Sequence, residues 1–118
     1  DIDKLTMKVQ QAINSAQSIA ISYNHQQIDV IHLFSALVFE ENGLIPNIFG
    51  KMSVDVKALV NSTKETLDKM PKVLGEGARG SSVYATRRFE EIFIKAENIT
   101  KKFKDSYISV EHVMLAID

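Results

Sequence analysis

The sequence predicts an all-α domain built from two related repeats, and three observations lead to that prediction. The 118 residues include only two Pro and five Gly, which favours few turns and long elements. Apolar residues recur at three- and four-residue spacing, as on one face of a helix. Residues 5–38 also align without gaps on residues 85–118. A chain of this length can bury the core of one compact domain.

The alignment corresponds to an internal period of 80 residues. It contains seven identical pairs in 34 positions, whereas composition alone predicts about two. The identical pairs are Thr6/Thr86, Ala16/Ala96, Ile19/Ile99, Ile28/Ile108, Val30/Val110, His32/His112 and Ala36/Ala116. We interpret the match as a duplication, with a first repeat over about 3–70, a linker over 71–82 and a partial second repeat over about 83–118. An intact second repeat would end at about residue 150 by this arithmetic, so the sequence predicts that it is truncated.

Each repeat is expected to begin with two helices, and the first repeat to continue with two more. The expected segments are 5–23, 29–38, 45–52 and 53–70 in the first repeat, then 85–103 and 109–118 in the second. Asp29 and its repeat partner Ser109 are good N-caps, and Ser53 is expected to cap the fourth helix. Gly43 is suited to a left-handed C′ position after the second helix. Residues 25–27 are expected to form a short connector.

Composition excludes several classes of function. The absence of Cys rules out disulfide scaffolds, Cys-ligated zinc, iron–sulfur clusters and thiol nucleophiles. A net charge of −1 gives no general attraction to nucleic acid or anionic membrane. No segment is apolar enough to span a bilayer and no signal peptide opens the sequence, which favours a protein that is not secreted.

Residues 75–80 spell G-x-G-x-x-G, the dinucleotide-binding fingerprint. That chemistry requires a strand before the glycines and a helix directly after them. Here a helix ending at Pro71 precedes the glycines, so a flexible linker is the favoured interpretation. The sequence has no P-loop motif either, and no ATP site is expected within it.

Two histidines, His32 and His112, occupy equivalent positions three residues after a cap. A metal or acid–base pair is one interpretation, but no carboxylate cluster or H-E-x-x-H motif supports it. The favoured interpretation is structural: each imidazole bonds backbone near the start of its helix. The basic pairs and triplets of the fifth helix (87–88 and 101–104) allow a helix-turn-helix nucleic-acid binder as a remote alternative, which the interspersed acids oppose.

Apolar residues outside the core stripe suggest a binding surface. Ile94 falls off the apolar face of the fifth helix, and Tyr84 and Tyr107 flank that helix. A cluster of such residues around a groove is typical of a peptide-binding surface.

Several motifs together resemble the N-terminal repeat domain of the Clp chaperone ATPases. They are residues 5–10 (LTMKVQ), 16–20 (AQSIA), Ile28, 32–37 (HLFSAL) and 107–112 (YISVEH). Pro71-Lys72-Val73 with Gly75 and Gly77 is similar to the inter-repeat linker of the ClpB-type disaggregases, more than to that of the ClpA or ClpC types. Residues 51–53 and Lys95 depart from the family pattern, and a lysine at the latter position shortens the expected apolar groove.

The resemblance implies two pseudo-twofold four-helix repeats mounted on a hexameric AAA+ ATPase, with ATP and Mg bound only in downstream modules. It implies a non-catalytic domain, monomeric in isolation, that binds unfolded or aggregated polypeptide. An adaptor-docking role, as in ClpA and ClpC types, is the alternative. The expected partners exclude nucleic acid and membrane but include an adaptor or an Hsp70-type co-chaperone system acting through the parent, in the cytoplasm or an organelle matrix.

Six residues are expected to contact substrate. In the family, a Thr at the start of the first helix and two acids around the turn between the fifth and sixth helices are implicated in substrate handling. The matching residues here are Thr6, Asp105 and Glu111. Phe93, Ile94 and Met114 are expected to supply apolar area in a groove with a polar rim. No residue is expected to be catalytic or to bind a cofactor or metal.

Overall fold

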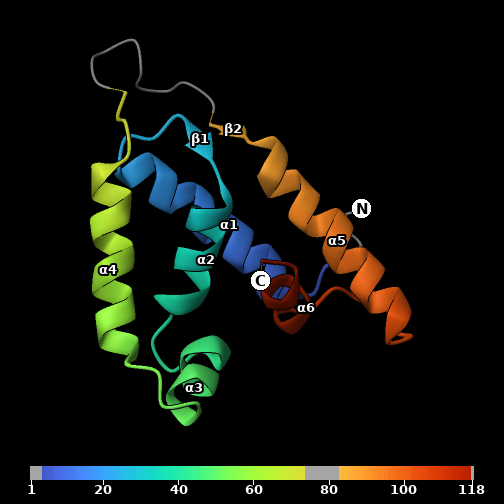
Figure 1. The fold of residues 1–118 in the computed structure, drawn as a ribbon. Helices are drawn as coiled ribbons and strands as arrows, with labels where there is room; N and C mark the ends of the chain where they lie inside the picture. Colours follow the sequence, from blue (N-terminus) through green and yellow to red (C-terminus); the bar gives the residue numbers. More distant parts are fainter. Residues whose placement is uncertain (1–3, 74–82, 118) are drawn as a thin grey trace.

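The computed structural model describes residues 4–73 and 83–117. These residues contain six helices and two very short strands (Figure 1). In chain order the elements are α1 (Met7–Ser22), β1 (Gln27–Ile28), α2 (Val30–Val38), α3 (Leu44–Lys51), α4 (Val56–Lys69), β2 (Tyr84–Ala85), α5 (Arg87–Lys102) and α6 (Val110–Ile117). The predicted all-α class is confirmed. Residues 74–82, which include the glycine motif and most of the predicted linker, lie outside the described residues.

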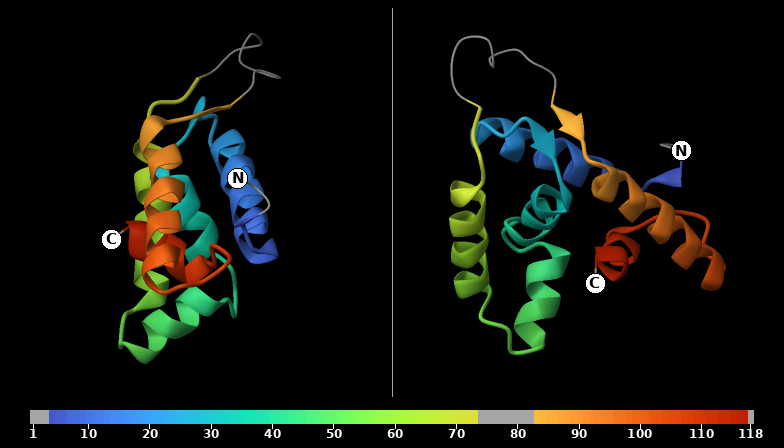
Figure 2. Two further views of the ribbon diagram at one scale, coloured as in Figure 1. Left: turned by 90° about the vertical axis from the view of Figure 1, so that its right-hand side faces the viewer. Right: turned by 45° about the horizontal axis from the view of Figure 1, so that its top comes forward.

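The helices form a flattened body in which the first two helices of each repeat pack on each other. Helix α1 packs against α2, and α5 packs against α6. Helix α4 lies beside α2 on one side, while α5 lies on the other (Figure 1). The edge-on view in Figure 2 shows how thin the body is, and its principal extents are 47 × 34 × 20 Å.

The two repeats are joined by a pair of equivalent backbone contacts. Strand β1 pairs in parallel with β2, so that Ile28 faces Ala85, and an isolated parallel bridge joins Leu5 to Ile108. A shift of 80 residues converts the first contact into the second. In each, the residue before a long helix donates its N–H to an isoleucine carbonyl of the other repeat: Thr86 to Ile28 at 2.9 Å and Thr6 to Ile108 at 3.0 Å. These two equivalent hydrogen bonds agree with the predicted pseudo-twofold relation between the repeats.

The core is built largely from equivalent positions of the two repeats. The positions within the helices follow the helical spacing seen in the sequence, which places them on one stripe of each helix, whereas the two isoleucines lie in the inter-repeat backbone contacts. The buried equivalent pairs are Val9/Phe89, Ala16/Ala96, Ile28/Ile108, Leu33/Val113 and Ala36/Ala116. Leu67 of α4 is fully buried as well, which explains why α4 stays against α2.

Side-chain caps fix the starts of four helices. The Thr6 hydroxyl accepts the Val9 N–H of α1, and the Thr86 hydroxyl accepts the Phe89 N–H of α5. Asp29 caps α2 as predicted, and it forms a capping box with His32. Each cap satisfies an N–H group that would otherwise have no partner at the helix start.

The structure corrects four of the predicted boundaries. Gly43 is the N-cap of α3 with φ of −73°, and the left-handed residue after α2 is Asn42 (φ 57°). Asn tolerates this conformation because its short side chain bonds locally. Asp55, rather than Ser53, caps α4; Ser53 is itself left-handed, with φ of 65°.

The other two corrections concern the strands. Leu5 and Ala85, which were expected inside helices, lie in extended segments before the caps, where they make the inter-repeat contacts. Gln27, expected in a connector, belongs to strand β1.

Candidate functional site

The loop between α5 and α6 places a carboxylate against the first turn of α6. After α5 ends, Lys104 adopts a left-handed conformation (φ 58°), and the Asp105 N–H donates to the Thr100 carbonyl at 2.8 Å. This turn directs the Asp105 side chain to His112, whose Nε2 lies 2.9 Å from Asp105 Oδ2. The first repeat makes the same turn at Asn24 (φ 61°), where His25 replaces the aspartate.

His112 is held by the backbone at the start of α6. The Ser109 N–H donates to its Nδ1 at 2.9 Å, so Nδ1 is an acceptor and Nε2 carries the hydrogen that it donates to Asp105. His32 is held in the same way, by the Asp29 N–H at 2.8 Å. The structural interpretation of both histidines is thus confirmed.

Ser109, His112 and Asp105 have the residue types of a hydrolytic triad, and the Ser109 hydroxyl lies 2.8 Å from His112 Nδ1. A catalytic base must have a free lone pair that can take the serine proton. Here the Nδ1 lone pair already accepts the Ser109 N–H, and the first repeat contains the same box around Asp29. We therefore interpret the arrangement as helix capping.

Two hollows lie on either side of Thr6, Ser109 and Glu111, which line both of them. We call the pair the α1–α6 groove. The hollow on the α5 side, of about 510 Å³, is also lined by Asp105, Phe103, Tyr107 and Leu115. The hollow on the α3 side, of about 400 Å³, is also lined by Leu37, Leu44, Ile45, Lys8 and Glu40.

The apolar side chains of this groove are unusually exposed for their size. The exposed fraction is 61% for Phe103, 59% for Tyr107, 50% for Leu115 and 48% for Leu44. Met7, which follows Thr6 at the start of α1, is 69% exposed. Exposed apolar side chains gathered beside polar ones are typical of a surface that binds protein. The carboxylates of Asp105 and Glu111 add negative charge to the rim.

Three of the six predicted contact residues come together in the groove, and three do not. Thr6, Asp105 and Glu111 line the hollow on the α5 side. Met114 is half-buried and packs against the core. Ile94 is 62% exposed on α5 but is not among the residues that line the groove.

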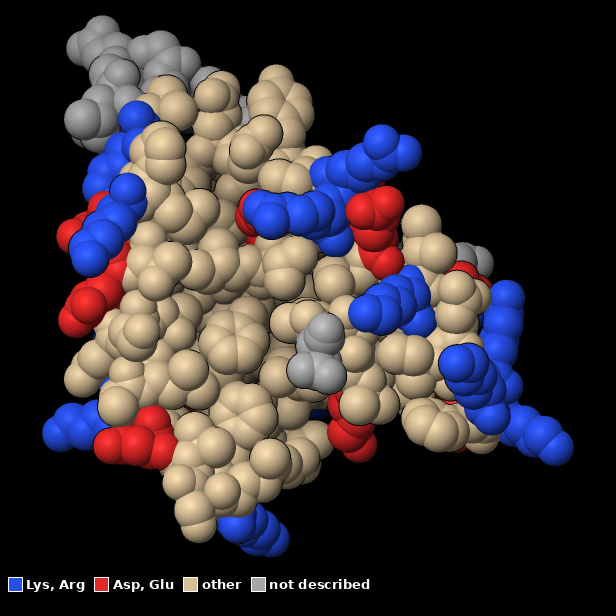
Figure 3. Space-filling model, viewed as in Figure 1, with Lys and Arg blue, Asp and Glu red and all other residues tan. Residues whose placement is uncertain are grey.

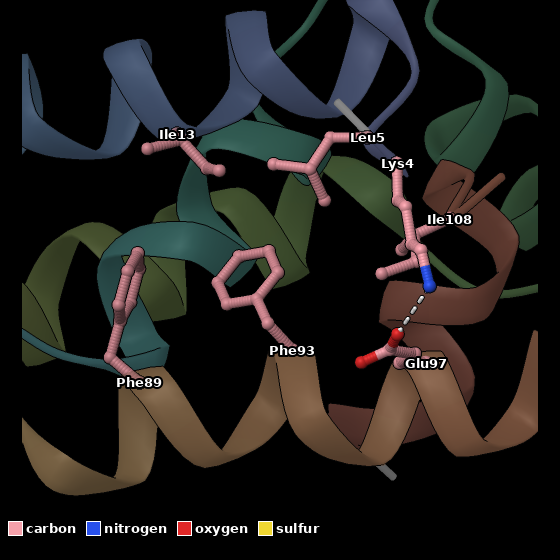
Figure 4. A pocket seen from close by; sticks show the side chains of 7 residues that line it. All are labelled: Lys4, Leu5, Ile13, Phe89, Phe93, Glu97 and Ile108. Atoms are coloured by element: carbon pink, nitrogen blue, oxygen red, sulfur yellow. Dashed lines mark hydrogen bonds and ion pairs between the residues drawn. The ribbon is translucent and has the colours of Figure 1, made fainter. Parts of the chain in front are cut away.

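Phe93 lies in a separate pocket of about 290 Å³ between α1 and α5 (Figure 4). It makes an edge-to-face contact with Phe89, at 5.3 Å between ring centroids, and faces Ile13 of α1 across the pocket. An exposed ion pair, Lys4 with Glu97 at 3.0 Å, lies at one end. Phe93 therefore contributes to the contact between the repeats.

Phe103, Leu44 and Leu115 are groove residues that sequence reasoning did not assign. Leu115 could have been found, because it is an apolar residue that falls off the buried stripe of α6, as Ile94 does on α5. Phe103 and Leu44 carried no such signal, since Phe103 continues the apolar stripe of α5 and Leu44 opens an apolar helix.

On the face shown in Figure 3, basic and acidic side chains lie side by side along α5 and along the outer side of α4, and the surface between these helices is mostly uncharged. Several basic side chains of α5 and its surroundings are paired with acids, as Arg88 is with Asp29 and Arg87 is with Glu91. Mixed charge of this kind does not form the basic stripe that nucleic-acid binding requires.

Two further features, a group of metal-holding side chains and a membrane-spanning helix, are absent from residues 4–73 and 83–117. No group of three or more His, Asp or Glu side chains there is arranged to hold a metal ion. Nor is any helix in these ranges both long and apolar enough to cross a membrane.

Residues 4–118 match the family described as the Clp repeat (R) N-terminal domain. The chain belongs to this family. Clp N-terminal domains of known structure share its fold: that of Hsp104 from Candida albicans superposes with a TM-score of 0.84 at 19% identity, covering 97% of this chain and 73% of that one. The N-domain of ClpV from Vibrio cholerae superposes with a TM-score of 0.79 at 14% identity, covering 98% and 66%.

Among sequences, the Clp N-terminal domain described here is similar to ClpB chaperones. It is 65% identical over 117 residues to the chaperone protein ClpB of Clostridium tetani, covering 99% of this chain and 14% of that protein. It is 43% identical over 116 residues to ClpB of Bacillus cereus, covering 98% and 13%. The chain thus spans about one seventh of the length of these relatives. The family resemblance inferred from the sequence motifs is confirmed.

Thr6 caps helix α1 in this Clp N-terminal domain, so a binding experiment on Thr6 variants must separate loss of stability from loss of substrate contact. We expect Thr6→Ala to lower the free energy of unfolding by about 1 kcal/mol, because the α1 cap is lost, whereas Thr6→Ser retains most of it. Thr86→Ala removes the equivalent cap of α5 away from the groove together with the hydrogen bond that the Thr86 hydroxyl donates to Asp29, so it should cost at least as much. Urea unfolding followed by circular dichroism measures all three. Equal stability of Thr6→Ala and wild type would contradict the cap.

Proposed function

We propose that this domain binds unfolded or aggregated polypeptide for a ClpB-type ATP-dependent disaggregase, and that the α1–α6 groove is the contact site. Its role is non-catalytic: the ATPase modules, with ATP and Mg, belong to other parts of the parent protein, which we expect to be a homohexamer. The curated relatives in the comparison are bacterial chaperones, and we expect the cytoplasm to be the compartment.

The observation that carries this proposal is the composition of the groove. Exposed Phe103, Tyr107 and Leu115 lie beside Thr6 and Glu111, two of the residues that line both hollows. Apolar side chains of an unfolded segment would gain burial there, while the carboxylates on the rim would attract basic residues and accept backbone N–H groups.

The groove favours weak binding. A contact of a few hundred Å² falls below the area of a standard stable interface, and an unfolded segment loses conformational freedom when it binds. We therefore expect micromolar or weaker dissociation constants. Weak, reversible capture suits a domain that passes its client on to a translocating ring.

Peptide titration tests the site. The probe is a fluorescent 12-residue peptide with alternating Leu and Phe and two Arg, compared with the same peptide carrying Glu in place of Arg. We expect the Arg peptide to bind several-fold more tightly and to shift the backbone amide signals of residues 103–115 and of the α1 start. Shifts confined to other parts of the domain would exclude the groove.

Glu111→Lys should weaken binding of the Arg peptide about tenfold and should narrow the difference between the two peptides, because the charge at the rim is reversed. Glu90→Lys is the matched control, since Glu90 is the acidic residue in the first turn of α5 as Glu111 is in the first turn of α6. Equal loss in both variants would indicate a general effect of charge. Selective capture of one folded adaptor, with no binding of either peptide, would support the adaptor-docking alternative.

A further inference from the structure

Two buried histidines are in direct contact at the junction of α1 and α2. His25 Nδ1 lies 2.8 Å from His32 Nε2, and the exposed fractions of the two residues are 6% and 0%. His32 Nδ1 accepts the Asp29 N–H, so His32 carries its hydrogen on Nε2 and donates it to His25 Nδ1. His25 then carries its own hydrogen on Nε2, an atom that is buried without a hydrogen-bond partner in the described residues.

In this arrangement His25 Nδ1 and His32 Nδ1 both accept hydrogen bonds, so neither atom can take up a proton without losing its hydrogen bond. A proton on His25 Nδ1 would face the hydrogen on His32 Nε2, and a proton on His32 Nδ1 would face the Asp29 N–H. The pair is therefore built for two neutral imidazoles. Burial lowers the pKa of His25 and of His32 below the ordinary value of 6.5, and a charge on His25 lowers that of His32 further.

In the second repeat, a carboxylate occupies the position equivalent to His25. Asp105 is the repeat equivalent of His25, and it accepts a hydrogen bond from His112, the equivalent of His32. His112 thus donates to a carboxylate, whereas His32 donates to a second imidazole. At this position the first repeat places two buried imidazoles in contact, and the second repeat has one imidazole.

The histidine pair is connected to the contact between the repeats. Strand β1 lies between His25 and Asp29. The carbonyls of Gln26, the residue before the strand, and of Ile28, its last residue, accept the N–H groups of Tyr84 and Thr86 at 3.0 and 2.9 Å. Asp29, whose N–H holds His32, also accepts the Thr86 hydroxyl at 2.9 Å and pairs with Arg88 of α5. Opening the His32 contact would therefore disturb both the start of α2 and the inter-repeat strand pair.

We propose that the His25–His32 pair is an acid-sensitive latch between the two repeats. Uptake of a proton breaks the imidazole–imidazole hydrogen bond, opens the capping box of α2 and loosens the β1–β2 contact. The second repeat has no imidazole–imidazole contact to break, because Asp105 occupies the position of His25.

The charged groups around the pair are few and partly oppose each other. On one side, Lys72 disfavours a positive charge on His25. The Lys72 ammonium lies 5.7 Å from the centroid of the Tyr23 ring. Tyr23 itself stacks on His25 with ring centroids 5.7 Å apart. On the other side, the Asp29 carboxylate favours a charge on His32, but Thr86 and Arg88 already engage it. The Leu67 carbonyl of α4 raises the pKa of His25, but burial is the largest influence on both rings and lowers the pKa of each.

The sign of the pH dependence follows from the lowered pKa values. Above about pH 6.5 the histidines are neutral in both the folded and the unfolded chain, so their full contribution to stability is present. As the pH falls below 6.5, the unfolded chain takes up protons that the folded domain resists, and stability is lost. A window from pH 7.5 to 5.5 isolates this effect from the titration of most carboxylates.

Reciprocal exchange of the equivalent residues provides the test. Urea unfolding at pH 7.5 and 5.5 should show a fall in the midpoint for the wild type, a smaller fall for His25→Asp, which keeps one buried imidazole of the pair, and a larger fall for Asp105→His. His25→Gln, which keeps a neutral hydrogen-bonding side chain, serves as the second variant if His25→Asp does not fold. Equal falls in the wild type and in a folded His25 variant would overturn the latch.

A local measurement distinguishes loosening of the latch from general acid sensitivity. Imidazole nitrogen shifts report the protonation of each histidine, and amide hydrogen exchange, corrected for intrinsic pH dependence, reports opening. We expect exchange at Val30, Tyr84 and Thr86 to accelerate at pH 5.5 before exchange in α5 and α6. Protonated His25 or His32 with unchanged protection of these amides would overturn the proposal.

Discussion

Leu33→Ala is expected to lower the free energy of unfolding by about 2–5 kcal/mol. Leu33 is fully buried in α2, at the centre of the core that both repeats share. Removal of its side chain leaves a cavity that neighbouring helices can fill only in part, since α2 is packed against α1, α4, α5 and α6. Because a domain of this size has about 5–15 kcal/mol of stability in total, such a loss is a large fraction of it.

Leu115→Ala is the matched control, because it removes the same side-chain atoms from a helix position that is 50% exposed. We expect a change within about 0.5 kcal/mol for this variant. Urea unfolding followed by circular dichroism gives both values. Similar losses in the two variants would contradict the assignment of Leu33 to the core and of Leu115 to the surface.

Much of the fold follows from local rules that act on single residues. Helical spacing identified the stripes around Val9, Leu33 and Phe89, and the chemistry of Asp29 identified the start of α2. The duplication predicted the equivalent roles of His32 and His112, which the structure confirms down to the backbone donor. These features depend on neighbours within a few positions, and the sequence therefore contains them.

The strands and the groove depend on contacts between distant segments. Two-residue strands have no periodicity, so the pairing of Gln27 and Ile28 with Tyr84 and Ala85 gave no signal in the sequence. The resemblance to the family brought Thr6, Asp105 and Glu111 together correctly as neighbours, although their role in binding remains a prediction. Which apolar residues accompany them was decided by packing.

Phe93 and Phe103 illustrate that point. Both lie on the apolar stripe of α5, but only Phe93 reaches α1, where the repeats meet. Phe103, the C-cap of α5, lies outside the pocket between α1 and α5, and its ring remains exposed next to the loop that carries Asp105. Amphipathic spacing identifies the face of a helix, whereas the packing of neighbouring segments decides how much of that face is covered.

The second large effect is expected from Asp29, whose side chain caps α2 and also contacts the other repeat. Its Oδ1 accepts the Val30 N–H at 2.7 Å and the Thr86 hydroxyl at 2.9 Å, and its Oδ2 pairs with Arg88. Burial raises the pKa of the carboxyl, but these three partners outweigh it and hold the pKa below the ordinary 3.8. This contribution is present above about pH 3.8 and is lost as the pH falls further.

We expect Asp29→Ala to lower the free energy of unfolding by about 1–3 kcal/mol, since the cap is lost and the Thr86 hydroxyl loses its acceptor. Asp29→Asn keeps an oxygen for the cap and removes the charge. Its cost should stay near 1 kcal/mol or less, because Arg88 is 75% exposed and water weakens that ion pair.

Ser109→Ala is the control in the second repeat, where the hydroxyl of the equivalent residue lies 2.8 Å from His112 Nδ1. If Asp29 contributes no more than its repeat equivalent, the losses for Asp29→Ala and Ser109→Ala should be similar. If it also joins the repeats, Asp29→Ala should cost more, and a double-mutant cycle with Thr86→Val should show a coupling of about 0.5 kcal/mol or more. Such coupling would mean that the duplicated halves are held together by a side chain that only the first of them possesses, since the second has serine at that position.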